Sequence, residues 1–157
     1  VDRSRGLGDV YKRQALLMQA VIPKMKEKNF GRIINITSAM VKNPHLIMGL
    51  STSARSGLHG LSKALSREVA QYNITINNVL PERIDTDRQT QILNFQAKLA
   101  DSTYEEAKKE LEETLTAKRM GTVEEFSGIC TFLCSEQAAY ISGQNISVDG
   151  GNSTNLI

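Results

Sequence analysis

Ser38, Ser51 and Arg55 have side chains of the types that take part in catalysis. Ser51 and Arg55 are four positions apart in a helical pattern, so both side chains lie on one helix face and can reach the same ligand. Hydroxyl groups can hold a ligand oxygen, and a guanidinium can bind anions or hydroxyls. An aliphatic hydroxyl is a far weaker acid than the hydroxyl of Tyr, so Ser51 would be a poor proton donor.

The elements that must position these residues alternate between helix and strand. Apolar residues recur at helical spacing over 15–28, and an apolar, β-branched strand pattern follows over 30–38. The same order repeats with a helix over 50–72 and a strand over 74–80. Alternation of this kind favours an α/β fold with a parallel sheet. Ser38 and the segment after 80 would then lie at the carboxyl ends of strands, where ligands bind.

The second half of the chain continues the alternation. Residues 87–118 are polar with weak periodicity and suit a mobile helical cover, in which Ser102 and Glu105 have the spacing of a capping box. Thr122 and Glu125 form another capping box before an apolar helical pattern, and a strand is predicted over 145–148.

The composition excludes several classes of function. No apolar run approaches the roughly 18 residues of a membrane span, and the N-terminus lacks the apolar core of a signal peptide, so we expect a cytoplasmic protein without a membrane partner. There are 19 basic and 17 acidic residues, and outside residues 1–14 there are 15 of each. With 5% aromatic residues and no Trp, we expect no nucleic-acid partner. Cys130 and Cys134 lack the spacing of a metal or redox site, so we expect no metal and two buried small side chains.

Residues 1–14 match neither a helical nor a strand pattern. We predict that they are a foreign or disordered tail, and that residues 15–157 are the C-terminal part of a single domain. Gly6-Leu7-Gly8 has the look of a phosphate-binding glycine turn, but such a turn must follow a strand and open a helix. The context therefore argues against that alternative.

Four further stretches place Ser38, Ser51 and Arg55 in a known pattern. They are Gly31–Ser38, Asn77–Thr86, Arg119–Glu125 and the closing tract Ile141–Gly151. In this order and at these separations, residues 15–151 resemble the C-terminal half of a short-chain dehydrogenase/reductase, similar to the 3-oxoacyl carrier protein reductases. The resemblance implies half of a doubly wound domain, which is a partial Rossmann-type parallel sheet with flanking helices.

The resemblance also implies a role for each candidate site residue. In the family a Ser precedes a Tyr-x-x-x-Lys pair, and here Ser51 stands in the Tyr slot and Arg55 in the Lys slot. Ser38 would hold the substrate oxygen, the Tyr slot passes a proton, and the Lys slot binds the cofactor ribose and lowers the pKa of the Tyr. The segment that touches the nicotinamide contains Pro81, Ile84 and Thr86. The implied reaction is hydride transfer between NADP or NAD and a small carbonyl or alcohol substrate.

Alternatives remain open for the whole chain and for single residues. In the family a Gly usually follows Pro81, and here Glu82 replaces it. The joint change at Ser51, Arg55 and Glu82 favours, as a second hypothesis, a catalytically silent binding or dimerisation protein. The missing glycine turn predicts that the chain alone is inactive and does not bind the cofactor. Ser51, or its neighbour Thr52, also suits a helix N-cap, which requires no chemistry.

Two other pairs of residues carry weaker signals. Arg83 and Arg88 either meet an anionic substrate or belong to a solvated charge cluster with Glu82, Asp85 and Asp87, and the sequence favours the cluster. His59 and Lys63 lie deeper in the same predicted helix, where we expect solvated or interface residues.

Small residues in the helix over 50–72 indicate that another helix packs closely against it. They are Ser53, Gly57, Gly60 and Ala64. Since the resembling family commonly dimerises through this helix and the one before it, a homo-oligomer through 15–28 and 50–72 is implied. Packing within one chain is the alternative.

Overall fold

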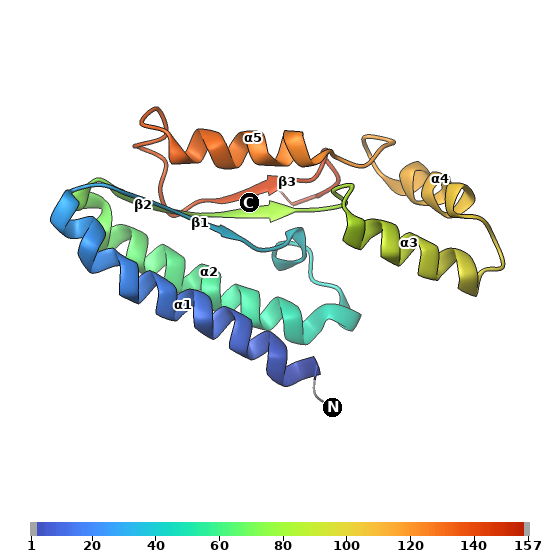
Figure 1. Cartoon of the computed structure of the whole chain (residues 1–157), viewed down its shortest axis with the longest axis horizontal. Coiled ribbons are helices and arrows are strands. Elements are labelled where there is room, and N and C mark those ends of the chain that lie inside the picture. The colour runs from blue at the N-terminus through green and yellow to red at the C-terminus, as the bar shows by residue number, and fades with distance from the viewer. Residues whose placement is uncertain (1–2, 156–157) are drawn as a thin grey trace.

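A computed structural model of the chain describes residues 3–155, with side chains from Tyr11 onward, and its centre is a three-stranded parallel sheet. The strands β1 (Gly31–Ile36), β2 (Ile74–Pro81) and β3 (Asn145–Val148) lie in the order β1-β2-β3. Helices α1 (Arg3–Lys28) and α2 (Gly49–Val69) cover one face of the sheet, and α5 (Val123–Cys134) covers the other (Figure 1). The predicted α/β class with a parallel sheet and flanking helices is confirmed.

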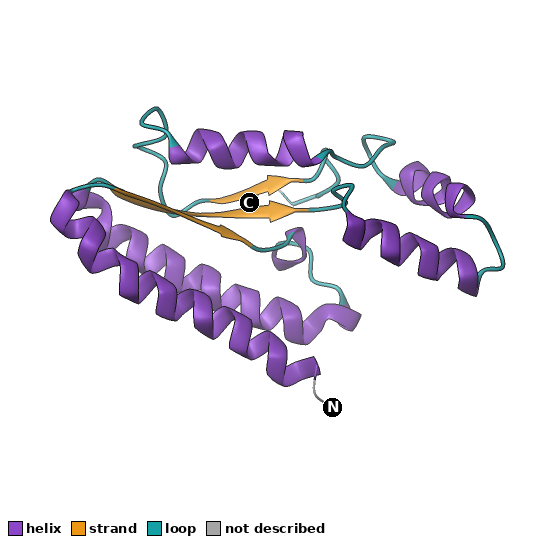
Figure 2. Ribbon diagram, viewed as in Figure 1, coloured by secondary structure: helices purple, strands orange, loops and turns teal. Residues whose placement is uncertain are grey.

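The central strand β2 is buried on both faces because helices cover both. Ile74 and Ile76 pack with Met18 and Leu58 in a core shared with α1 and α2. Val79 points to the opposite face and packs with Leu133 of α5. Figure 2 shows the resulting layers. Burial on both faces agrees with a strand of apolar and β-branched residues that only the buried Asn77 and Asn78 interrupt.

Helix α1 is longer than its apolar pattern predicts. It begins at Arg3 and not at Ala15, so residues 3–14 are helical instead of a disordered tail, and Gly6 and Gly8 lie inside the helix. The physical reason is that extending an existing helix costs much less than nucleating one, so a stretch without periodicity can continue it. Tyr11 also packs against the core of α1 and α2. The foreign origin of this segment stays a prediction.

The strands end where short connections lead to the remaining helices. After β1 come the 3-10 turns η1 (Ala39–Val41) and η2 (Leu46–Met48), and α2 is extended by η3 (Ala70–Tyr72), which completes the predicted helix over 50–72. Beyond β2, α3 (Asp87–Leu99) and α4 (Tyr104–Thr114) form the cover at the carboxyl side of the sheet (Figure 1). The capping box of α4 is Thr103 with Glu106, one position later than predicted.

A row of Asn side chains ties the three strands together. The Asn35 amide donates to Asn78 Oδ1 at 3.1 Å and to Ser62 Oγ of α2 at 3.0 Å. The Asn78 amide donates in turn to Asn145 Oδ1 at 2.7 Å. Asn35 and Asn78 are register partners, and Asn78 is 2% exposed, whereas Asn145 is exposed. The network therefore links β1, β2, β3 and α2, and its buried part, Asn35 with Asn78 and Ser62, lies where water does not easily replace a lost partner.

The two cysteines differ in burial. Cys130 is half-buried against the core beside α5, whereas Cys134, the last residue of α5, is exposed. The prediction of burial is therefore wrong for Cys134. Among the described side chains, those of residues 11–155, no cluster of three or more His, Cys, Asp or Glu is placed to hold a metal ion. None of the helices within residues 3–155 has the length and apolar character needed to cross a membrane.

Candidate active site

A cavity of about 370 Å³ opens at the carboxyl ends of β1 and β2. Five of the six predicted site residues line it: Ser38, Arg55, Pro81, Ile84 and Thr86. The tertiary structure thus brings together residues that are up to 48 positions apart in the sequence. The volume of this cavity lies within the usual range for small-molecule sites, roughly 300–1,000 Å³.

Ser38 reaches the cavity just after the end of β1. Its backbone is extended, with φ −168°, and its Oγ accepts a hydrogen bond from Met40 N at 3.3 Å, which caps η1. The side chain is half-buried and lines the cavity wall. Its hydroxyl hydrogen remains available to a ligand oxygen, since the capping bond uses the oxygen only as an acceptor.

Ser51, the sixth predicted residue, contacts Arg55 directly. The Arg55 Nη1 group donates a hydrogen bond to Ser51 Oγ, and Ser51 is 4% exposed. The alternative of Ser51 as a helix cap is wrong, because α2 begins two residues earlier and its N-cap is Met48, which makes no side-chain capping bond. Thr52 does not cap the helix either, since its Oγ1 is buried without a partner among the described residues.

Arg55 connects the buried Ser51 with the cavity. Its guanidinium lies over the ring of Tyr11, 5.3 Å from the centroid, and its Nε is buried without an acceptor in the described part of the chain. A guanidinium has five N–H donors, so the bond to Ser51 leaves others for a ligand. Arg55 can therefore keep a positive charge at the cavity wall and still hold Ser51.

The sequence analysis missed the pair formed by Thr37 and His59. His59 is 7% exposed, and its Nε2 lies 2.8 Å from Thr37 Oγ1, next to Ser38. The expectation of a solvated or interface histidine is thus wrong, because the face of α2 that carries Ser51 and Arg55 continues inward to His59. The repeated spacing of four is the signal that could have found it. Lys63 is exposed, as expected, and donates to Gly143 O at 3.1 Å.

Burial first, and then the charges of Lys42 and Arg55, together lower the pKa of His59 from 6.5 to about 4. We expect the His59 imidazole to titrate near pH 4 in an NMR pH titration, with a His45→Gln variant to assign the two histidine signals. Between pH 6.5 and 4 the unfolded chain binds a proton that the folded chain does not, so the free energy of unfolding should fall as the pH falls through this window. The total loss should be about 2 kcal/mol and should disappear in His59→Gln. A His59 midpoint near pH 6.5 would contradict this prediction.

The loop after β2 brings Pro81, Ile84 and Thr86 to the cavity. Ile84 pairs with Gly121, where an added Cβ would lie 2.9 Å from Ile84 Cδ1, so a larger residue at this position would displace the end of the Ile84 side chain. Thr86 caps α3 by accepting from Gln89 N at 3.4 Å. The Glu82 carboxylate does not enter this cavity, because it accepts from the Asn152 amide at 2.9 Å on the other side of the loop.

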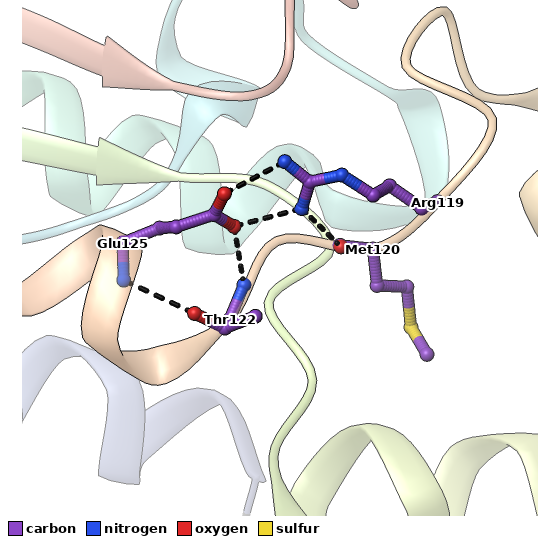
Figure 3. A network of polar contacts seen from close by, with 4 residues as sticks. All are labelled: Arg119, Met120, Thr122 and Glu125. Carbon is purple, nitrogen blue, oxygen red and sulfur yellow. Dashed lines mark hydrogen bonds and ion pairs between the residues drawn. The ribbon is translucent and has the colours of Figure 1, made fainter.

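A capping box with a bound arginine positions the opposite wall (Figure 3). The Glu125 carboxylate accepts two hydrogen bonds from Arg119, at 2.8 and 2.7 Å, and one from Thr122 N at 2.8 Å. These bonds lower the pKa of Glu125 to about 2, Arg119 being the first cause. The box starts α5 as predicted, and Val123 and Phe126 in its first turn line the cavity. They were not predicted, and nothing in their residue types signals a site.

Comparisons with known proteins identify the fold and its family. The pattern of the enoyl-(acyl carrier protein) reductase family matches residues 12–153. The NADPH-dependent reductase BacG of Bacillus subtilis is 38% identical over 82% of this chain and 49% of its own length. The 3-oxoacyl-[acyl-carrier-protein] reductase FabG of Aquifex aeolicus is 35% identical over 87% of this chain and 50% of its own. The chain belongs to the short-chain dehydrogenase/reductase family.

A solved structure of the same family gives the same result for the fold. The L-sorbose reductase of Gluconobacter frateurii was solved with NADPH and L-sorbose. The match covers 89% of this chain and 54% of the reductase chain, with a TM-score of 0.82 and 27% sequence identity. The family resemblance of the sequence and the Rossmann-type class are thereby confirmed. The chain spans about half the length of the curated relatives it matches.

Proposed function

We propose that the chain is the C-terminal half of an NAD(P)-dependent oxidoreductase that interconverts a small carbonyl compound and its alcohol. The observation that carries this proposal is the common cavity of Ser38, Arg55, Pro81, Ile84 and Thr86, with Ser51 bound to Arg55 behind it. Relatives named as an NADPH-dependent reductase and a 3-oxoacyl-[acyl-carrier-protein] reductase support it. We propose NADP or NAD as cofactor without choosing between them.

The residues of the cavity fit the nicotinamide end of such a cofactor. Apolar side chains of Ile36, Ile84 and Phe126 suit a flat ring, and Thr86 with the backbone of the loop suits its amide. The Arg55 side chain would hold the ribose hydroxyls, and its buried Nε lacks an acceptor among the described residues. When bound, the nicotinamide supplies or accepts the hydride.

The residues of this chain would orient the substrate better than they would protonate it. Ser38 can donate a hydrogen bond to a carbonyl oxygen, as the resemblance implies. Ser51 is a weak acid, and its buried hydroxyl is held by Arg55. We therefore expect slow protonation, with a rate below that of a Tyr enzyme by the ~10²- to 10⁴-fold that general acid catalysis contributes.

The test is turnover by the complete protein. The gene is sequenced upstream of the codon for Ala15, and the complete protein is produced from it. Oxidation of NADPH and NADH that depends on a carbonyl substrate is then measured with 2-oxo acids and 3-oxoacyl thioesters. Any turnover would eliminate the alternative of a silent binding or dimerisation protein, which the changes at Ser51, Arg55 and Glu82 favour. Cofactor binding without turnover of any substrate would support that alternative. For the 157-residue chain alone, the expected absence of cofactor binding and activity stays a prediction, as does the cytoplasmic location.

We further propose a homodimer through α1 and α2. Apolar side chains on the outer side of α1 are exposed, among them Leu16, Leu17 and Val21. On α2 the small residues Gly57 and Gly60 have open space where a Cβ would lie. Among the described residues nothing lies within 4 Å of a Cβ placed at these two glycines, which favours a second chain over packing within one chain.

Substitution Leu17→Glu is expected to weaken the dimer at least about 10-fold in sedimentation equilibrium, because a charge would be buried at the interface. The matched control is Leu99→Glu, which places the same charge on an exposed leucine of α3 and should leave the dimer unchanged. A chain that is monomeric at every concentration, or an equal effect of the two substitutions, would contradict the proposed interface.

A further inference from the structure

The charged residues in the wall of the 370 Å³ cavity are both cationic. They are Arg55, from α2, and Arg83, from the loop after β2. The other described residues that line it are apolar or carry hydroxyl groups, such as Thr37, Ser38 and Thr86. The cavity therefore holds two guanidinium groups and no carboxylate from the described residues.

The acidic neighbours of Arg83 are engaged elsewhere. Glu82 accepts from Asn152, and Asp85 lies 3.9 Å from the Lys108 ammonium. No ion pair within 4.0 Å joins Arg83 or Arg55 to a carboxylate of residues 11–155, the part of the chain whose side chains the structure describes. The charge cluster favoured by the sequence is thus wrong for Arg83, whereas Arg88 is exposed and solvated as expected.

Arg83 also borders a second cavity of about 220 Å³, on the other side of the loop. The carboxylates there already have donors. Glu125 is bound by Arg119, and Asp149 accepts from Gly151 N at 3.0 Å and Ser153 N at 3.1 Å. These carboxylates therefore do not supply the missing counter-charge of Arg83.

The backbone holds Arg83 in place without an acidic partner. Its φ of 52° lies in the left-handed region, which is unfavourable for a residue with a long side chain. Hydrogen bonds from Gly121 N to Arg83 O, at 3.0 Å, and from Asp85 N to Gly121 O, at 2.8 Å, hold this conformation. A conformation that is kept against its intrinsic preference points to a role for the side chain it presents.

The wall of this cavity holds two arginines, Arg55 and Arg83, that have no ion-pair partner among the described side chains. A neutral ligand does not require two positive charges. A nicotinamide amide and ribose hydroxyls can be satisfied by Arg55 and the hydroxyl-bearing wall, which leaves the half-buried Arg83 free to attract an anion. The positive field also acts on His59, whose pKa is lowered by burial and then by Lys42 and Arg55. We propose that the substrate carries a carboxylate, which binds to Arg83 with the charge of Arg55 behind it.

This inference rests on the proposed oxidoreductase function, but its test requires neither cofactor nor turnover. The 157-residue chain is titrated at low ionic strength with phenylacetate and with its neutral isostere phenylacetamide, and binding is followed by NMR. Phenylacetate is expected to bind about 10-fold more tightly, because a charge-assisted bidentate pair is stronger than a neutral hydrogen bond. Added salt should reduce that preference.

Three variants test the role of Arg83. Arg83→Gln should remove most of the preference for phenylacetate and leave phenylacetamide binding unchanged, and Arg83→Lys should retain part of it because it keeps the charge. Arg88→Gln is the matched control, since it removes an exposed arginine five positions away that does not line the cavity. It should behave as the unmodified chain does.

Equal affinities for the two probes would overturn the inference, and so would equal effects of Arg83→Gln and Arg88→Gln. It would also be overturned if phenylacetate perturbed the signals of Arg119 and Glu125 instead of those of the 370 Å³ cavity. Nicotinamide mononucleotide serves as a further probe, and binding of this probe without phenylacetate would assign the two arginines to the cofactor. If the chain shows no preference for phenylacetate, the turnover test of the complete protein can still succeed. The failure of this inference and the failure of the proposed oxidoreductase function are therefore distinguishable.

Discussion

The paired substitution Ser51→Tyr with Arg55→Lys is expected to raise the rate of carbonyl reduction by the complete protein about 10²- to 10⁴-fold. A Tyr hydroxyl has a pKa near 10, which an adjacent ammonium can lower toward working pH, whereas a Ser hydroxyl does not reach this range. The measurement is carbonyl-dependent oxidation of NADPH at saturating cofactor.

The structure shows why both residues must change together. Arg55 donates to Ser51 Oγ, and Ser51 is buried, so a Tyr at position 51 has to occupy space that the guanidinium now fills. Ser51→Tyr alone is expected to lower stability and give little rate gain, since overpacking typically costs about 1–3 kcal/mol. Because the two side chains are in contact, their effects should be strongly non-additive in a double-mutant cycle.

A matched control uses exposed positions outside α1 and α2. Ser127→Tyr with Arg88→Lys introduces the same residue types on α5 and α3 and should leave the rate unchanged. If the Ser51→Tyr, Arg55→Lys variant binds cofactor and folds but turns over no faster than the unmodified protein, the assignment of these two positions to the Tyr and Lys slots is wrong.

Asn78→Ala is expected to have the largest effect on stability, lowering the free energy of unfolding by about 2–5 kcal/mol. The Asn78 amide accepts from Asn35 at 3.1 Å and donates to Asn145 at 2.7 Å, and the site is 2% exposed. Truncation leaves the buried Asn35 amide without its Asn78 acceptor, at a cost of about 1–3 kcal/mol, and it also removes the bond to the exposed Asn145 and the packing of the buried Asn78 side chain. The measurement is denaturant unfolding at pH 7.5, where His59 is neutral in both states.

Asn94→Ala is the control for this substitution. Asn94 is exposed on α3 and its amide donates only to Thr90 O, at 2.9 Å, so its loss should change stability by less than about 0.5 kcal/mol. A loss for Asn78→Ala that is no greater than that of Asn94→Ala would show that the strands do not depend on this network.

The sequence predicts elements well where local interactions decide them. The capping box of Thr122 and Glu125 starts α5 as expected, because both bonds join residues three positions apart. The strand over 74–80 is also found, because a strand covered on both faces leaves a largely apolar and β-branched run. The start of α1 was missed because residues 3–14 have no apolar period, and their helical state follows from the helix they extend.

Part of the candidate site also follows from local sequence patterns, and part of it depends on the tertiary structure. Motif order and spacing alone place Ser38, Pro81, Ile84 and Thr86 at the carboxyl ends of two parallel strands, because the chain direction of a strand determines at which edge it ends. Only the tertiary structure decides that Ser51 is bound by Arg55 and does not cap a helix, that His59 is buried against Thr37, and that Arg83 faces a cavity without an acid. The physical reason is that the rotation of a helix and the partners of a charge depend on residues distant in the sequence, which no local pattern contains.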